Sequence, residues 1–193
     1  MLRDILKVGA IACISPLQTI LSVLIVTRLV SELGTEALAG YGIGARLEFL
    51  LIPITFSIGV ANVPMVGMAV GAGDIARARS VAWTAGVVAT SVLTALGIFV
   101  ALFPLLWAGL FTSDPAILAS ASTYLHWAGP FYGLFGLGLC LYFASQGSGK
   151  ILGPVLAGTV RLLVVLIGGL WLVSMNAPAW QLYALVGFAM AVY

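Results

Sequence analysis

The sequence predicts an all-α integral membrane protein, organised as one lobe of six transmembrane helices. The 193-residue chain is 62% hydrophobic and 7% charged, with a mean hydropathy of +1.19. A soluble domain of this size does not hide so much apolar surface, because folded soluble proteins cover themselves with polar groups. The few charges also divide the chain into long uncharged runs, and about 20 such residues are enough to cross the hydrocarbon core of a bilayer.

The second predicted span, residues 37–71, is the clearest of these runs. Its core and the turn after it, residues 49–73, contain 25 residues without a formal charge. The turn leads to Asp74, which we expect to cap the following helix by accepting hydrogen bonds from its free N–H groups. Arg77 and Arg79 come next and hold that helix end at one membrane face. This stretch therefore predicts a span, a tight turn and the start of the next span.

The same charges delimit the other spans. The first uncharged run has 20 residues, between Lys7 and Arg28, and the third has 34 residues, between Arg79 and Asp114. A further long run ends at Lys150. The predicted spans of the single transmembrane lobe, residues 1–193, are residues 5–30, 37–71, 77–110, 116–146, 151–173 and 179–193.

The sixth predicted span is shorter than a bilayer requires and stops at Tyr193 without a polar flank. The interpretation is that this last helix is truncated and that the chain is a fragment of a longer membrane protein.

The charges between the spans predict an orientation. Basic residues are concentrated in loops that fall on one side of a six-helix layout, namely Arg3, Lys7, Arg77, Arg79 and Lys150. The opposite loops carry the acidic residues Glu32, Glu36 and Asp114, with Arg28 as the basic residue near them. Cytoplasmic loops carry an excess of Lys and Arg, so we expect a multi-pass protein with a cytoplasmic amino terminus. The scattered basic residues form no patch for nucleic acid.

Glu48 is the first candidate functional residue, because ionisable groups inside a membrane span are costly. If the second helix starts near Glu36, Glu48 lies roughly 18 Å along it at about 1.5 Å per residue. The carboxylate is therefore a candidate proton or cation carrier. The alternative is a structural ion pair with the neighbours of Arg46 or with Arg161.

The other intramembrane polar residues have two interpretations each. Arg161 keeps its proton, so it is a counter-ion or an anchor rather than a carrier. His126 is either a proton shuttle or a hydrogen-bonded interior side chain. The uncharged candidates either line a wet cavity or bond helices together: Gln18, Thr19, Asn62, Tyr132 and Gln146.

The sequence offers no catalytic constellation. We find no nucleophile with a histidine partner, no pair of metal ligands at helical spacing and no phosphate-binding loop. The prediction is therefore a protein that is not an enzyme, with no catalytic residues, no metal site and no cofactor.

Several short segments, spread over most of the chain, occur in an order known from one family. They are residues 34–39 (GTEALA), 41–48 (YGIGARLE), 70–74 (VGAGD), 76–79 (ARAR), 110–112 (LFT), 124–125 (YL) and 146–149 (QGSG). With this ordered set, the chain resembles the carboxy-terminal half of a multidrug and toxic compound extrusion (MATE) transporter.

The resemblance implies an efflux antiporter of the plasma (inner) membrane, with twelve helices in two six-helix lobes. Small amphipathic or cationic substrates pass between the lobes, and inward movement of H+ or Na+ drives export. This chain then supplies helices seven to twelve, and its partner is the amino-terminal lobe, which is absent from this sequence.

The chain departs from the family pattern in one respect. Several members place acidic coupling residues in the first and fourth helices of this lobe, where this chain has Gln18, Thr19 and His126 and an apolar run near Phe135. Coupling therefore uses Glu48 or, as we expect, resides in the amino-terminal lobe. Two other functions stay open: a lipid-precursor flippase of the wider superfamily, and a non-transporting membrane scaffold.

Overall fold

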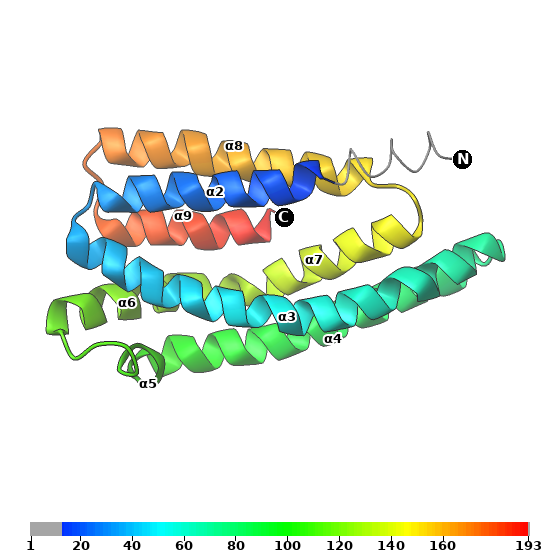
Figure 1. Cartoon of the computed structure of the whole chain (residues 1–193), viewed down its shortest axis with the longest axis horizontal. Coiled ribbons are helices and arrows are strands. Elements are labelled where there is room, and N and C mark those ends of the chain that lie inside the picture. Colours follow the sequence, from blue (N-terminus) through cyan, green and yellow to red (C-terminus); the bar gives the residue numbers. More distant parts are fainter. Residues whose placement is uncertain (1–12, 193) are drawn as a thin grey trace.

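The computed structural model describes residues 13–192, which form helices joined by short turns (Figure 1). The helices are α2 (Ile14–Ser31), α3 (Thr35–Gly71), α4 (Ile75–Leu102), α5 (Pro104–Ala108), α6 (Pro115–Ala128), the 3-10 helix η1 (Gly129–Phe131), α7 (Tyr132–Gly147), α8 (Leu152–Ser174) and α9 (Ala179–Ala191). Five segments are long and apolar enough to cross a membrane, and α9 is a shorter apolar helix. The beginning of the first predicted span, residues 5–12, lies outside the described residues.

The lobe consists of two groups of helices around the long helix α3. Helices α2, α8 and α9 pack together on one side, and α4 packs along α3 and α7 on the other (Figure 1). The amino-terminal half of α3 contacts α6, where Gly40 faces Ser120, and its carboxy-terminal half contacts α7, where Gly59 faces Phe143. One helix thus connects both groups, and its amino-terminal half carries the candidate residue Glu48.

The third and fourth spans were predicted as single helices, but the structure divides each of them into shorter helices. Helix α4 ends at Leu102, and the short α5 follows because Pro104 lacks an N–H group and keeps Phe103 out of the helical region, at φ −125° and ψ 55°. The predicted span 116–146 is divided by η1, which contains Pro130. Each proline interrupts the backbone hydrogen-bond series, so these stretches are broken rather than single straight helices.

The two prolines inside the second span bend its helix without interrupting it. Helix α3 is continuous over 37 residues although it contains Pro53 and Pro64. Figure 1 shows it curved near its middle, and Pro53 is its central residue. A proline inside a helix removes one hydrogen bond and bends the axis.

Side-chain caps begin two helices, and the one at Asp74 confirms the prediction. The Asp74 carboxylate accepts a hydrogen bond from the backbone N of Arg77 at 2.9 Å at the start of α4. Asp114 does the same for α6 with the backbone N of Ala116 at 2.8 Å and of Ile117 at 3.3 Å, directly before Pro115. Each cap satisfies N–H groups that have no partner inside their helix.

The charged residues separate between the two ends of the lobe. The turns α3–α4 and α7–α8 lie at one end, and the connections α2–α3, α5–α6 and α8–α9 lie at the other (Figure 1). The first end carries the described basic residues Arg77, Arg79 and Lys150 with one acid, Asp74, and the second carries Glu32, Glu36 and Asp114 with one basic residue, Arg28. Arg3 and Lys7 lie outside the described residues. Which end faces the cytoplasm stays a prediction.

The distribution of side chains is typical of a protein immersed in lipid. Large apolar residues are exposed on the outside, with Met68 at 69% and Leu110 at 73% exposure. The largest fully buried side chains include Tyr124, Tyr132 and Tyr183. The phenol groups therefore gather inside the lobe, while leucine and methionine face outwards.

Most hydroxyl groups within the spans bond to their own helix. Thr27 donates to the carbonyl oxygen of Val23 at 2.8 Å, Thr90 to that of Gly86 at 2.7 Å, and the buried Thr55 to that of Leu51 at 3.1 Å. Such bonds to the carbonyl four residues earlier satisfy a hydroxyl without a tertiary partner.

The closest approach of two backbones occurs where α4 crosses η1. A Cβ atom added at Gly129 would lie 2.6 Å from the carbonyl oxygen of Gly97, and one at Gly97 would overlap the carbonyl oxygen of Gly129. Small residues allow helices in membranes to approach this closely. This reciprocal contact holds the break between α6 and α7 against α4.

Candidate functional site

The candidate site is built on the contact between α3 and α6. Gly40, Gly44 and Glu48 are spaced four residues apart, so they share one face of α3. Gly40 faces Ser120, and Gly44 faces the ring of Tyr124, where an added Cβ would overlap the ring carbons. The absence of side chains at the two glycines therefore lets Ser120 and Tyr124 of α6 reach α3.

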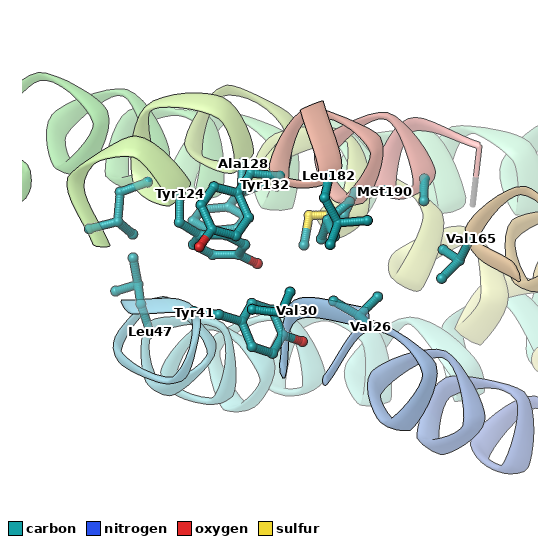
Figure 2. Packing of buried hydrophobic residues seen from close by; sticks show 14 of the residues in the cluster. Val26, Val30, Tyr41, Leu47, Tyr124, Ala128, Tyr132, Val165, Leu182 and Met190 are labelled. Carbon is teal, nitrogen blue, oxygen red and sulfur yellow. The ribbon is translucent and has the colours of Figure 1, made fainter. Parts of the chain in front are cut away.

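The Glu48 carboxylate is held by Tyr124. The Tyr124 hydroxyl donates a hydrogen bond to Oε1 of Glu48, which is half-buried, whereas Tyr124 itself is fully buried. The hydroxyl of Tyr132 on α7 interacts with the same carboxylate but makes no hydrogen bond of ordinary geometry. Figure 2 shows Tyr124 and Tyr132 pointing from α6 and α7 towards the α3 side of the core, where Tyr41 lies.

Aromatic rings pack against Tyr124, which holds this carboxylate. Tyr41 packs edge-to-face on Tyr124 with ring centroids 5.3 Å apart, and Tyr183 of α9 also packs edge-to-face on it at 5.2 Å. Edge-to-face pairs at this distance are favourable, and they fix the orientation of the central ring. Tyr124 is therefore positioned by neighbours from α3 and α9 before it bonds to Glu48.

The tyrosine cluster continues towards one end of the lobe. The Tyr183 hydroxyl lies 2.9 Å from the Ser120 hydroxyl and donates to the carbonyl oxygen of Ala37 at 3.2 Å. Both side chains line a cavity of about 420 Å³ at the connection between α2 and α3, which also contains Glu36 and Thr35. A polar, acidic hollow thus opens at this end of the lobe. The tyrosine cluster lies between this hollow and Glu48.

Arg161 joins the cluster from α8. Its guanidinium group lies over the ring of Phe135 at 5.7 Å from the centroid, and its positive charge acts electrostatically on Glu48 and Tyr41. Next to it, Gln18 Nε2 donates to Thr159 Oγ1 at 2.7 Å between α2 and α8. The structure therefore brings four of the predicted site residues into one neighbourhood: Glu48, Tyr132, Arg161 and Gln18.

The remaining predicted residues lie apart from this cluster. His126 is exposed on α6, two residues from Tyr124 and so on another face of that helix. Asn62 is buried between α3 and α7, where its Nδ2 donates to the carbonyl oxygen of Cys140 at 3.4 Å. Arg46 is exposed and stacks on Phe111 at 4.9 Å from the ring centroid.

The chemistry of the cluster is that of one carboxylate with a phenol donor, Tyr124, and a cation, Arg161. Among the described residues, the other four carboxylates, Glu32, Glu36, Asp74 and Asp114, lie at helix ends. Within residues 13–192 no three His, Cys, Asp or Glu side chains gather in a way that can hold a metal ion. The cluster therefore places one ionisable carboxylate inside the helix bundle, away from the helix ends.

The sequence matches the MatE family over residues 12–171, which is most of the chain. The chain belongs to the MATE family. In keeping with this, its fold is similar to that of the Vibrio cholerae MATE transporter VcmN, with a TM-score of 0.86 at 21% identity, over 95% of this chain and 42% of that one. A MOP superfamily transporter from Pyrococcus furiosus matches with a TM-score of 0.80 at 17% identity, over 98% of this chain and 42% of that one.

Curated MATE relatives are similar in sequence. A probable multidrug resistance protein NorM from Thermotoga maritima is 28% identical over 154 residues, which are 80% of this chain and 33% of that protein. The protein of the same name from Neisseria meningitidis is 28% identical over 131 residues, 67% of this chain and 28% of that protein. The chain thus spans about a third of the length of these relatives. The family and the helices together establish a multi-pass membrane protein.

Sequence reasoning missed three residues of the site in this MATE lobe. Tyr124 entered only as part of the family resemblance, and neither Ser120 nor Tyr183 was considered. The available signal was that a tyrosine hydroxyl inside an apolar span needs a hydrogen-bond partner. The chain has six tyrosines, and the sequence does not say which of them faces Glu48.

Gly44→Ala is expected to disturb the site because the new methyl group overlaps the Tyr124 ring. Tyr124 must then move away from Glu48, so transport by the assembled transporter should fall severalfold. The matched control is Gly42→Ala in the same helix, where an added Cβ meets no atom within 4 Å. Transport rates in membrane vesicles at equal protein levels measure the difference. Equal rates for the two variants would contradict the claim that transport depends on the position of the Tyr124 ring.

Proposed function

We propose that this chain is one lobe of a multidrug exporter, which moves small amphipathic or cationic molecules out across the plasma membrane in exchange for H+ or Na+. The family match over residues 12–171 carries the export function, and the names of the NorM relatives support drug-like substrates. The chain spans less than half of its relatives, so we propose that it works with an amino-terminal lobe and that substrates pass between the two.

The proposed coupling group of this lobe is Glu48. It is the described carboxylate that lies away from the helix ends, and it faces groups from three other helices, Tyr124, Tyr132 and Arg161. A charged Glu48 attracts the Tyr124 hydroxyl and the Arg161 guanidinium, which hold α6 and α8 towards α3. When Glu48 takes up a cation, these attractions weaken, so the packing of the three helices responds to occupancy.

The geometry favours H+ over Na+ as the coupling ion in this lobe. A hard metal cation needs several oxygen ligands, whereas the cluster offers one carboxylate whose Oε1 already accepts the Tyr124 hydroxyl. A proton needs a single oxygen. The positive-inside rule supports the proposed orientation, with Arg77, Arg79 and Lys150 at the cytoplasmic end.

Efflux of a fluorescent organic cation from cells or vesicles that contain the assembled transporter tests this proposal. A protonophore that collapses the proton gradient should stop efflux, while an ionophore that collapses only the sodium gradient should leave it unchanged. Efflux that stops only with the sodium gradient would assign coupling to Na+. Efflux that continues after both the proton gradient and the sodium gradient have been collapsed would exclude an antiporter.

A further inference from the structure

The basic end of the lobe contains a cavity that the proposed export function does not use. It lies where α3 and α4 meet the end of α7, and it has a volume of about 290 Å³. Its polar lining includes Arg79 of α4 and Lys150 of the α7–α8 turn, with the hydroxyls of Ser145 and Ser148. Two cations from separate segments therefore face one small hollow, at a helix end where the spans reach the membrane surface.

The charge of this cavity is not balanced by an acidic side chain. No carboxylate is among its lining residues. Asp74, the acid nearest to Arg79 in sequence, caps α4 through the backbone N of Arg77 and lines a neighbouring cavity instead. An ion pair of the described residues joins Arg28 and Glu32 at the opposite end of the lobe. The cavity is thus a positively charged site without an internal counter-ion.

The turn after α7 fixes the backbone position of Lys150. Gly149 has a positive φ of 72°, and the N–H of Lys150 donates to the carbonyl oxygen of Ser145 at 3.0 Å. This is the hydrogen bond by which a left-handed glycine ends a helix and reverses the chain. Ser145 and Ser148 donate their own hydroxyls to backbone carbonyls of α7. Arg79 and Lys150 are therefore the groups that remain to bind an anion.

The other half of the lining is apolar. It includes Val66 and Val70 of α3 and Ala82 of α4. Ala82 lies three residues further along α4 than Arg79. A free phosphate ion gains nothing from such a surface, whereas a phospholipid places apolar carbons directly below its phosphate. The volume is at the lower limit of small-molecule sites, so it fits a head group rather than a whole lipid.

We propose that this cavity binds the phosphate of an anionic phospholipid, with Arg79 and Lys150 contacting the phosphate and the apolar wall contacting the first acyl carbons. Basic hollows between transmembrane helices are suited to anionic head groups, and each nearby Lys or Arg contributes attraction. The inference uses the charges and the lining alone, so it holds whether or not Glu48 couples transport.

The test measures binding of phosphatidylglycerol to the purified protein in a zwitterionic detergent by native mass spectrometry, with phosphatidylcholine as the neutral comparison. We expect Arg79→Gln and Lys150→Gln each to weaken phosphatidylglycerol binding about fivefold, and the double variant to weaken it more than tenfold. The matched control is Arg77→Gln, which removes one charge from the same turn but from the neighbouring cavity. It should change binding less than twofold.

Three results would overturn the proposal. An equal loss in Arg77→Gln would indicate general surface charge rather than a site. Equal binding of phosphatidylglycerol and phosphatidylcholine would remove the requirement for an anionic head group. Full displacement of the lipid by inorganic phosphate in the same buffer would show that the apolar wall contributes nothing and that a free anion is the ligand.

Discussion

Glu48→Gln is expected to reduce drug export by the assembled transporter to the level of membranes without it. Glutamine keeps the size of glutamate, and its carbonyl oxygen still accepts the hydrogen bond from Tyr124. It cannot take up or release a proton, so under the proposal the lobe loses its response to the gradient. Export of a fluorescent cation and the amount of folded protein in the membrane are measured together.

A matched control for this variant is Glu32→Gln. Glu32 is an exposed carboxylate at the end of α2, paired with Arg28 and outside the acidic hollow, so the identical chemical change there should leave export unchanged. If Glu48→Gln lowers folded protein as much as export, the carboxylate has the structural role that the sequence also allowed. If export persists at the wild-type rate, coupling resides in the amino-terminal lobe.

Tyr124→Phe separates the two roles further. It removes the hydroxyl that Glu48 accepts and keeps the ring that packs on Tyr41 and Tyr183. Hydrogen bonds to charged groups contribute about 1.5–3 kcal/mol, so a modest loss of stability is expected. Export should fall partially rather than completely, since the carboxylate itself remains.

Gly97→Ala is expected to have the largest effect on stability. The added methyl group overlaps the carbonyl oxygen of Gly129, which belongs to the backbone of η1 and cannot rotate away. Overpacking of a filled interior costs about 1–3 kcal/mol, occasionally more, and we expect a value near 3 kcal/mol here. The separation of α4 from η1 must increase, which also loosens the break between α6 and α7.

Denaturant titration of the purified protein in detergent measures this loss. The control is Gly153→Ala in α8, where an added Cβ meets no atom within 4 Å; its stability should equal or slightly exceed that of the unchanged protein because alanine favours a helix. Equal stability of the two variants would mean that the α4–η1 contact relaxes without cost.

The sequence was sufficient for the class of fold because that class depends on composition and on uncharged runs. The cap at Asp74 and the separation of basic from acidic helix ends were predicted from local residues, and the structure contains both. The break at Gly129–Phe131 was missed although Pro130 marks it. Hydropathy does not detect an interruption inside an apolar run, and the extent of the disruption depends on how α4 supports it.

The site was harder to predict than the fold. Glu48 was identified because a charge inside a span is conspicuous, and Arg161 was named as its possible partner for the same reason. The direct partner, Tyr124, is 76 residues away and reaches Glu48 only because Gly44 leaves room for its ring. That dependence on a residue without a side chain is a property of packing, which a single sequence does not reveal.

The hydroxyls bonded to their own helix bear on how the protein is made. Because Thr27, Thr55 and Thr90 are satisfied locally, they add little to the cost of inserting each span during synthesis. Glu48 has no such local partner, since Tyr124 arrives only with a later helix. The newly made α3 therefore enters the membrane with an unsatisfied acid, and its burial becomes favourable only when the later helices have been synthesised and have associated with it.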